Sequence, residues 1–220
     1  MANRIKYGFQ WDRNANGKDC PQPERRPVAS AYQGAITGGG NVDLNVGDVV
    51  KTLADGTIAI AEGSEKTSYD PGVVDADIPY GVIVGFEPYY DGTVMQPTNV
   101  LPGGTTYGTN FTRESAALVV PIEMGVWSVA VDATSASYDT YAEWRATVGE
   151  TIDMVNSNGV TGDAEPELDL ATIADSASAS QIFKIHGLDP ARDNRDYDAA
   201  GFRLLVIANR YANAANTAGV

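Results

Sequence analysis

The chain has 220 residues, 43% of them hydrophobic and 20% charged, which suits a folded protein with a sizeable core and excludes a disordered chain. Its formal net charge of −14 repels nucleic-acid phosphates, so a nucleic-acid partner is not expected. Residues 1–30 lack the apolar core of a secretory signal, and no apolar run of about 20 residues marks a membrane span. We therefore expect a soluble protein made in a cytoplasm.

Residues 1–35 are predicted to form an extended N-terminal arm. Pro21, Pro23 and Pro27 each fix φ and lack a hydrogen-bond donor, so this stretch should be extended. The first 30 residues hold six of the 15 basic side chains and carry a net charge of +3, whereas the rest of the chain carries −17. A basic arm ahead of an acidic body, residues 36–220, predicts two surfaces with different partners; a chance excess of charge is the alternative.

The arm contains a stretch that resembles the start of a calcium-binding loop. Asp12 to Gly17 match the pattern D-x-N-x-N-G of an EF-hand. The bidentate acid of such a loop would fall on Pro23, and Pro21 and Pro23 forbid the helix that should follow. We therefore predict a turn at Asn16-Gly17 and no metal site.

The first part of the body has the alternation of β-strands. Apolar residues at alternate positions from 42 to 60 surround Asp55-Gly56, which predicts a β-hairpin. The run "YGVIVGF" at 80–86 is apolar and lies between polar segments, as in a buried strand.

The second part of the body predicts four more strands and a helix. Residues 116–133 suggest two strands around Glu123-Met124-Gly125, with Trp127, Val129 and Val131 on one face. Tyr138, Tyr141 and Ala142 recur at helical spacing, and Gly149 is a plausible helix end. The stretches "QIFKIHGL" and "FRLLVIANRY" predict a final strand pair joined by a polar loop.

Three polar segments are predicted to be long loops, at about residues 61–79, 87–113 and 156–180. Loops of this length in a compact domain usually have a function or lie at an interface. The second loop is a candidate intersubunit contact because it carries three tyrosines, with ordinary packing as the alternative: Tyr89, Tyr90 and Tyr107. The fold class predicted from these elements is mainly β, with a single barrel-like or sandwich-like body, the extended arm, and at most one or two short helices.

Residue types that carry chemistry do not form a convincing catalytic pattern. His186 is the only histidine and Cys20 the only cysteine, which excludes a His/Cys metal site and an intramolecular disulfide. No serine occupies a G-x-S-x-G elbow, and none of the 29 acids stands out as a paired carboxylate. We predict no enzyme activity, no catalytic or metal residues and no cofactor.

An acidic loop near the C-terminus is a weak candidate for a cation site. Its acids are Asp189, Asp193, Asp196 and Asp198. Arg192 and Arg195 interleave with them, so a solvated, self-paired loop is the favoured interpretation and a bound cation stays open.

Four segments resemble structural proteins of tailed-bacteriophage heads, specifically the small decoration or cement proteins. They are "YGFQWDRNANGK" with its following prolines, "VGDVVKTLADGTIAIAEG", "PYGVIVGF", and the ending "QIFKIHGLDP…LLVIANRY". The resemblance covers most of the chain, although each motif is short.

The resemblance implies a non-enzymatic protein on the outer capsid surface of the virion, made in the host cytoplasm. Its partner would be the major capsid protein, and it would itself be a homo-oligomer, most often a trimer, without a membrane or nucleic-acid partner. The residues of the arm expected to contact the capsid are basic or aromatic: Arg4, Lys6, Tyr7, Phe9, Trp11, Arg13, Arg25 and Arg26. On this view, deleting residues 1–30 should leave a folded body that no longer binds capsids.

A carbohydrate-binding, lectin-like β-module for adhesion to a host surface is the alternative function. It would use exposed aromatic rings as sugar platforms, with Tyr89, Tyr90 and Trp144 as candidates. A hydrolase with paired carboxylates is a third possibility, for which the sequence contains no positive motif.

Overall fold

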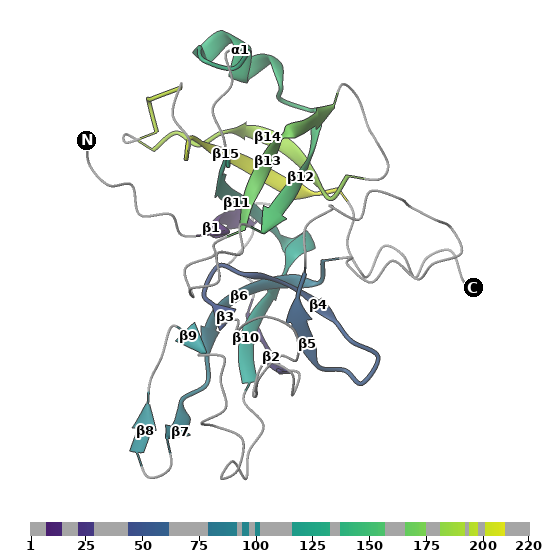
Figure 1. Cartoon of the computed structure of the whole chain (residues 1–220), viewed down its shortest axis with the longest axis vertical. Helices are drawn as coiled ribbons and strands as arrows, with labels where there is room; N and C mark the ends of the chain where they lie inside the picture. Colours follow the sequence, from purple (N-terminus) through teal and green to yellow (C-terminus); the bar gives the residue numbers. More distant parts are fainter. Residues whose placement is uncertain are drawn as a thin grey trace.

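The computed structural model describes residues 8–14, 22–28, 44–61, 79–91, 94–96, 100–101, 116–132, 137–156, 166–174, 181–191, 194–197 and 201–209. These residues are mainly β, as predicted, and most of their strands form two antiparallel sheets that lie one above the other along the longest axis of the molecule (Figure 1). The predicted turn at Asn16-Gly17, Cys20, and most of the predicted loop at 61–79 lie outside the described residues.

The larger sheet contains strands from both ends of the chain. In spatial order its strands are β1 (Gln10–Asn14), β11 (Gly125–Ala130), β15 (Arg203–Ala208), β14 (Phe183–Leu188), β12 (Thr151–Asn156) and β13 (Pro166–Ala174). The sheet curls, because Val131, just after β11, forms a single parallel bridge with Leu168 of β13. One bridge is not a ladder, so this sheet is strongly curved without being a closed barrel.

The smaller main sheet is also antiparallel, and a single bridge likewise connects its two edges. In spatial order its strands are β2 (Glu24–Pro27), β10 (Ala116–Pro121), β6 (Gly81–Phe86), β4 (Val49–Thr52) and β5 (Ile58–Ile60). Val28, just after β2, forms a single parallel bridge with Ile58 of β5. Of the two predicted architectures, the described residues therefore fit the sandwich-like one.

Most of the elements predicted from local patterns are confirmed. β4 and β5 pair around Gly56, whose φ of +83° is the left-handed conformation that favours glycine in a tight turn. β10 and β11 are separated only by a 3-10 turn at Ile122–Met124, and β14 pairs with β15. The helix α1 (Tyr141–Ala146) begins at a capping box, in which Thr140 and Glu143 satisfy each other's backbone donors.

The predicted loop at 87–113 is wrong where the structure describes it. β7 (Tyr89–Asp91) and β8 (Val94–Gln96) form a two-stranded hairpin, and β9 (Val100–Leu101) pairs with β3 (Leu44–Asn45). The sequence signal for the hairpin was Asp91-Gly92, the same turn dipeptide that marked the confirmed hairpin of β4 and β5.

The predicted loop at 156–180 is also wrong in its central part, which is β13. Leu168 and Leu170 alternate with Asp169 there, and both leucine side chains are buried. The acidic residues around this short alternation concealed it, because an inward-facing strand needs apolar residues only at every second position.

The hydrophobic core is continuous between the two main sheets. A large cluster combines Trp127, Phe183 and Phe202 of the larger sheet and its loops with Val82 and Val120 of the smaller sheet. A second cluster, which includes Ile58 and Ile83, fills the inside of the smaller sheet. The shared cluster explains why the sequence showed no boundary between two domains.

The described parts of residues 1–35 belong to this body. β1 pairs with β11 and β2 pairs with β10, so each is an edge strand of one main sheet. Phe9 is 3% exposed and its ring lies 4.9 Å from that of Phe183, measured between centroids. The Phe9 N–H donates to the Gly47 carbonyl oxygen at 3.0 Å, in the loop that leads into β4. Residues 8–14 and 22–28 are therefore strands and core, and deleting residues 1–30 would remove parts of both sheets.

Replacing Phe9 by alanine tests whether the N-terminal segment is part of the core. Loss of a buried ring should lower the free energy of unfolding by about 3–5 kcal/mol, measured by urea denaturation. The control is Arg13→Ala in the adjoining strand β1. Its exposed side chain pairs with the neighbouring Asp12, and its loss should cost less than about 0.5 kcal/mol. Equal, small effects of both variants would contradict a core role for Phe9.

Gly125 has no room for a side chain, because two tryptophan rings lie against it. A Cβ atom there would stand 2.5 Å from Trp11 and 2.8 Å from Trp127, whose rings meet edge to face with centroids 5.2 Å apart. Gly125→Ala should therefore displace Trp11 and destabilise the fold by about 1–3 kcal/mol. Gly187→Ala is the matched control, since no atom lies within 4 Å of its added Cβ. Urea denaturation followed by tryptophan fluorescence measures both, and a Gly125→Ala variant as stable as the control would contradict the prediction.

Candidate functional site

The predicted aromatic contacts of the N-terminal segment are largely internal. Phe9 was predicted to face a capsid, and this is wrong because its side chain lies in the core shared by the two sheets. Trp11 is partly buried against the same core and meets Trp127 edge to face. Arg4, Lys6 and Tyr7 lie outside the described residues, so their predicted role stays a prediction.

The three described arginines of this segment are paired with carboxylates. Arg13 lies 2.9 Å from Asp12, and Arg25 lies 2.8 Å from Glu87. Arg26 lies 2.6 Å from Glu24, measured between nitrogen and oxygen as in the other pairs. All three remain partly or largely exposed, but their positive charge is locally balanced.

Arg26, Glu24 and Tyr80 form a hydrogen-bonded cluster that attaches β2 to the start of β6. The Tyr80 hydroxyl donates to Glu24 at 2.5 Å, and Arg26 donates to both partners. The Arg26 guanidinium carbon also lies 4.6 Å from the centre of the Tyr80 ring, in a cation–π geometry. The cluster holds the edge strand β2 against the sheet, so we assign these three residues a structural role.

The cluster changes the pKa of each member. The hydrogen bond from Tyr80, supported by Arg26, lowers the pKa of Glu24 below its ordinary value of 4.5. Burial raises the pKa of Tyr80. Burial alone would lower the pKa of Arg26, but its hydrogen bonds to Glu24 and Tyr80 outweigh that effect and raise it. All three groups therefore keep one charge state near neutral pH.

The tyrosines predicted as an intersubunit contact lie on a projecting element. Tyr89 and Tyr90 belong to β7, and the hairpin of β7 and β8 extends from the lower end of the body in Figure 1. Among the strands that the structure describes, this hairpin is a separate two-stranded sheet and pairs with neither main sheet. Tyr107 lies outside the described residues.

The proposed sugar platform at Trp144 is wrong. Its side chain is 1% exposed, its indole N–H donates to the Tyr197 carbonyl oxygen at 3.0 Å, and its ring lies against Phe202. A sugar cannot stack on a ring that is already covered on its faces by protein. His186 is exposed on β14.

Asp189, of the acidic loop after β14, has a structural role. It accepts hydrogen bonds from Ser128 at 2.5 Å and from the Ala191 N–H at 2.8 Å, and it lies 3.3 Å from Arg203. These partners differ from the predicted ones, Arg192 and Arg195. Asp196 is exposed, while Arg192, Asp193 and Asp198 are outside the described part of the chain.

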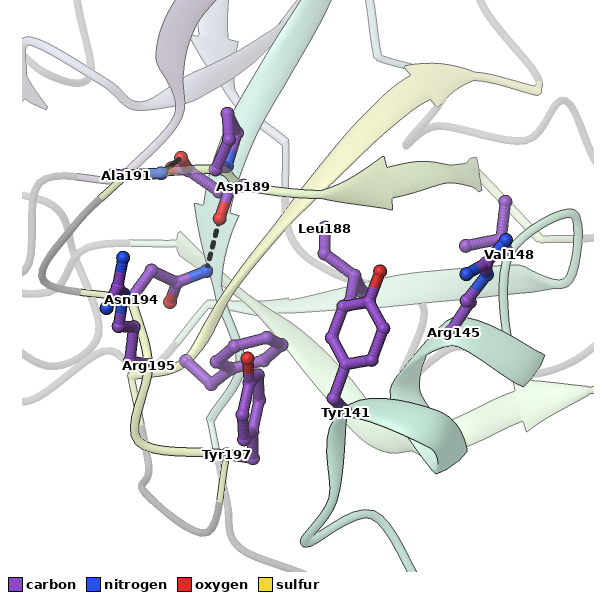
Figure 2. A pocket seen from close by; sticks show the side chains of 11 residues that line it. Tyr141, Arg145, Val148, Leu188, Asp189, Ala191, Asn194, Arg195 and Tyr197 are labelled. Atoms are coloured by element: carbon purple, nitrogen blue, oxygen red, sulfur yellow. Dashed lines mark hydrogen bonds between the residues drawn. The ribbon is translucent and has the colours of Figure 1, made fainter.

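Sequence reasoning missed a half-open groove of about 370 Å³ between α1 and the loop after β14 (Figure 2). Tyr141 and Arg145 reach it from α1, and Arg195 and Tyr197 reach it from the loop. Tyr141 and Tyr197 meet edge to face, with ring centroids 6.0 Å apart. The pattern of the sequence held no signal for this groove, because its two walls are about 50 residues apart in the chain.

Among the described residues, no group of three or more His, Cys, Asp or Glu side chains is placed to hold a metal ion. Within the same residues, no helix has the length and apolar character to cross a membrane. Comparison with known proteins gave no match to a family model, to a curated protein or to a solved structure.

The lowered pKa of Glu24 predicts a pH-dependent contribution to stability. A carboxyl whose folded pKa lies below its unfolded pKa stabilises the fold above the unfolded value of 4.5, and this stabilisation disappears as pH falls through the folded pKa. The difference in free energy of unfolding between the wild type and Glu24→Gln should thus be largest above pH 4.5 and narrow on acidification. The effect should be small, because the Glu24 side chain is 45% exposed.

Denaturant melts at several pH values measure this difference. Tyr80→Phe, which removes the donor hydroxyl, should remove most of the pH dependence that distinguishes the two proteins. A difference between wild type and Glu24→Gln that grows on acidification would contradict the assignment.

Proposed function

We propose that this chain is a decoration protein that binds the outer surface of a tailed-bacteriophage head and strengthens contacts between major capsid subunits. The role is non-enzymatic and needs no cofactor. The protein would act as a homo-oligomer, with a trimer as the form that the resemblance implies.

The β7–β8 hairpin is the observation that carries this proposal. A lone two-stranded hairpin is marginally stable in water, because it lacks a third strand or a helix to cover it. This one extends away from the body (Figure 1), so packing against a partner surface would stabilise it. A projecting hairpin with two adjacent tyrosines, Tyr89 and Tyr90, suits contact with a neighbouring protein subunit.

The segments that carry the resemblance also support the proposal. "VGDVVKTLADGTIAIAEG" spans β4 and β5, "PYGVIVGF" spans β6, and the ending spans β14 and β15. They therefore form the scaffold, and the β7–β8 hairpin that projects from it is the contact element that we propose. The arginines of β1 and β2 are already paired with carboxylates. Electrostatic attraction between the basic arm and a capsid should therefore be weaker than the sequence implied.

Stabilisation of a capsid by such a protein follows from mass action. A protein that binds the assembled shell and not its separated subunits shifts the equilibrium towards the shell. When the free protein is at about 100 times its dissociation constant, binding stabilises the shell by about 2.7 kcal/mol for each site. Many symmetric copies make the total effect large even when each contact is weak.

The test uses heads purified without this chain, from the phage that encodes it. The full chain should sediment with the heads and raise the temperature at which they disassemble. Replacing residues 89–96 by a glycine–serine linker of equal length should abolish both effects and leave the body's circular dichroism and urea midpoint unchanged. The matched control is Met124→Ser, which alters a side chain 42% exposed on another element.

Two results would count against the proposal in different ways. If the full chain neither sediments with the heads nor protects them, the decoration role is wrong. If the linker variant binds as well as the wild type, the role stands and the hairpin is not its contact.

A further inference from the structure

We infer that the groove between α1 and the loop after β14 binds an acidic peptide segment of a partner protein. Carboxylates of the peptide would pair with Arg145 and Arg195, and an apolar side chain would lie on the tyrosines between them. This inference rests on the groove alone and does not depend on the proposed capsid role.

The groove is formed before any ligand arrives, because buried contacts hold its floor and one wall. Phe202 is fully buried beneath it. Its ring packs against that of Trp144 with centroids 4.9 Å apart and meets that of Tyr197 edge to face at 5.5 Å. Asn194, which is 5% exposed, donates to the carbonyl oxygens of Asp189 and Arg203 at 2.9 Å and accepts from the Arg203 N–H at 2.7 Å. A preformed site loses little conformational entropy on binding.

The middle of the groove is apolar and exposed. Tyr141, which is 51% exposed, lines the groove with Leu188. Val148, which is 44% exposed, adds an apolar side chain beside Arg145 (Figure 2). Tyrosine gives a large contact area with few rotatable bonds, which is why it is enriched at protein interfaces. A volume of about 370 Å³ has room for one or two side chains rather than for a folded domain.

The ends of the groove are positively charged. Figure 2 shows Arg145 and Arg195 on opposite sides of Tyr141 and Tyr197. Both arginines are exposed, and neither forms an ion pair with a carboxylate of the described residues. The carboxylate that lines the groove, that of Asp189, is already bound by Ser128, Arg203 and the Ala191 N–H.

This charge pattern selects the class of ligand. In a chain of net charge −14, two arginines in one groove that have no carboxylate partner among the described residues attract acidic groups locally. Nucleic acid is disfavoured relative to a short acidic peptide, because its regularly spaced phosphates continue beyond the groove over the acidic body. We expect a small anion to pair with one arginine at a time, whereas an extended peptide with several carboxylates can pair with both.

The experiment uses a fluorescein-labelled peptide of sequence Gly-Asp-Glu-Leu-Glu-Asp-Gly and the full-length protein, followed by fluorescence anisotropy. Binding should be saturable and weaken as salt increases, since exposed ion pairs are screened. Two control peptides separate the contributions: one with amides in place of the acids, and one with glycine in place of leucine. Each should bind more weakly than the parent peptide.

Charge-reversal variants place the peptide in the groove. Arg145→Glu and Arg195→Glu should each weaken binding by roughly fivefold to tenfold, because each loses an ion pair and gains a repulsion. The matched control is Arg13→Glu, which makes the same change of net charge on β1 and should leave binding nearly unchanged. Thermal melts check that all three variants stay folded.

Hydrogen exchange gives an independent readout of the same site. The bound peptide should slow exchange in residues 141–148 and 188–191 and leave the β7–β8 hairpin unaffected. The inference is overturned if the wild type shows no saturable binding, if the amide peptide binds as tightly as the acidic one, or if Arg13→Glu weakens binding as much as the groove variants.

Discussion

Phe9 joins the N-terminal segment to both main sheets, and the rest of the structure depends on its burial. Its backbone N–H bonds to the loop that enters the smaller main sheet, while its ring packs on Phe183 of the larger sheet. Two residues later, Trp11 packs edge to face on Trp127, so that β1 is attached through its side chains as well as its ladder. One short segment thus contributes to both sheets, and the shared core makes the two sheets one structural unit.

The number of basic residues in a segment of this protein does not show where positive charge is available for binding, because many of these residues are paired with carboxylates. The N-terminal residues hold an excess of basic side chains, yet Arg13, Arg25 and Arg26 are each balanced by a carboxylate nearby. The acidic remainder of the chain contains Arg145 and Arg195, which face a groove without such a partner among the described residues. The groove that we propose for acidic peptides therefore lies in the part of the chain with the more negative charge.

The two candidate contact regions lie at opposite ends of the molecule's long axis. The groove lies beside α1 at the upper end of Figure 1, and the β7–β8 hairpin projects from the lower end. The main sheets and their continuous core lie between them. A molecule with this arrangement is suited to bridging two protein surfaces, since each end presents a contact element on a fixed scaffold.

Local patterns in the sequence determined much of the fold. The hairpin of β4 and β5, the strands β6, β10, β11, β14 and β15, and helix α1 each follow from spacing, turn dipeptides or capping residues within about 20 positions. The hairpin of β7 and β8 and the strand β13 were hidden by polar neighbours, although Asp91-Gly92 and the alternation at Leu168 and Leu170 were present.

Only the tertiary structure decided where β1 and β2 pair, that Phe9 and Trp144 are buried, and that α1 meets the loop after β14. Those contacts join residues that are roughly 50 to more than 100 positions apart. The shared apolar core brings such distant residues together. Which residues meet in that core is decided by the whole fold, so no local sequence pattern predicts it.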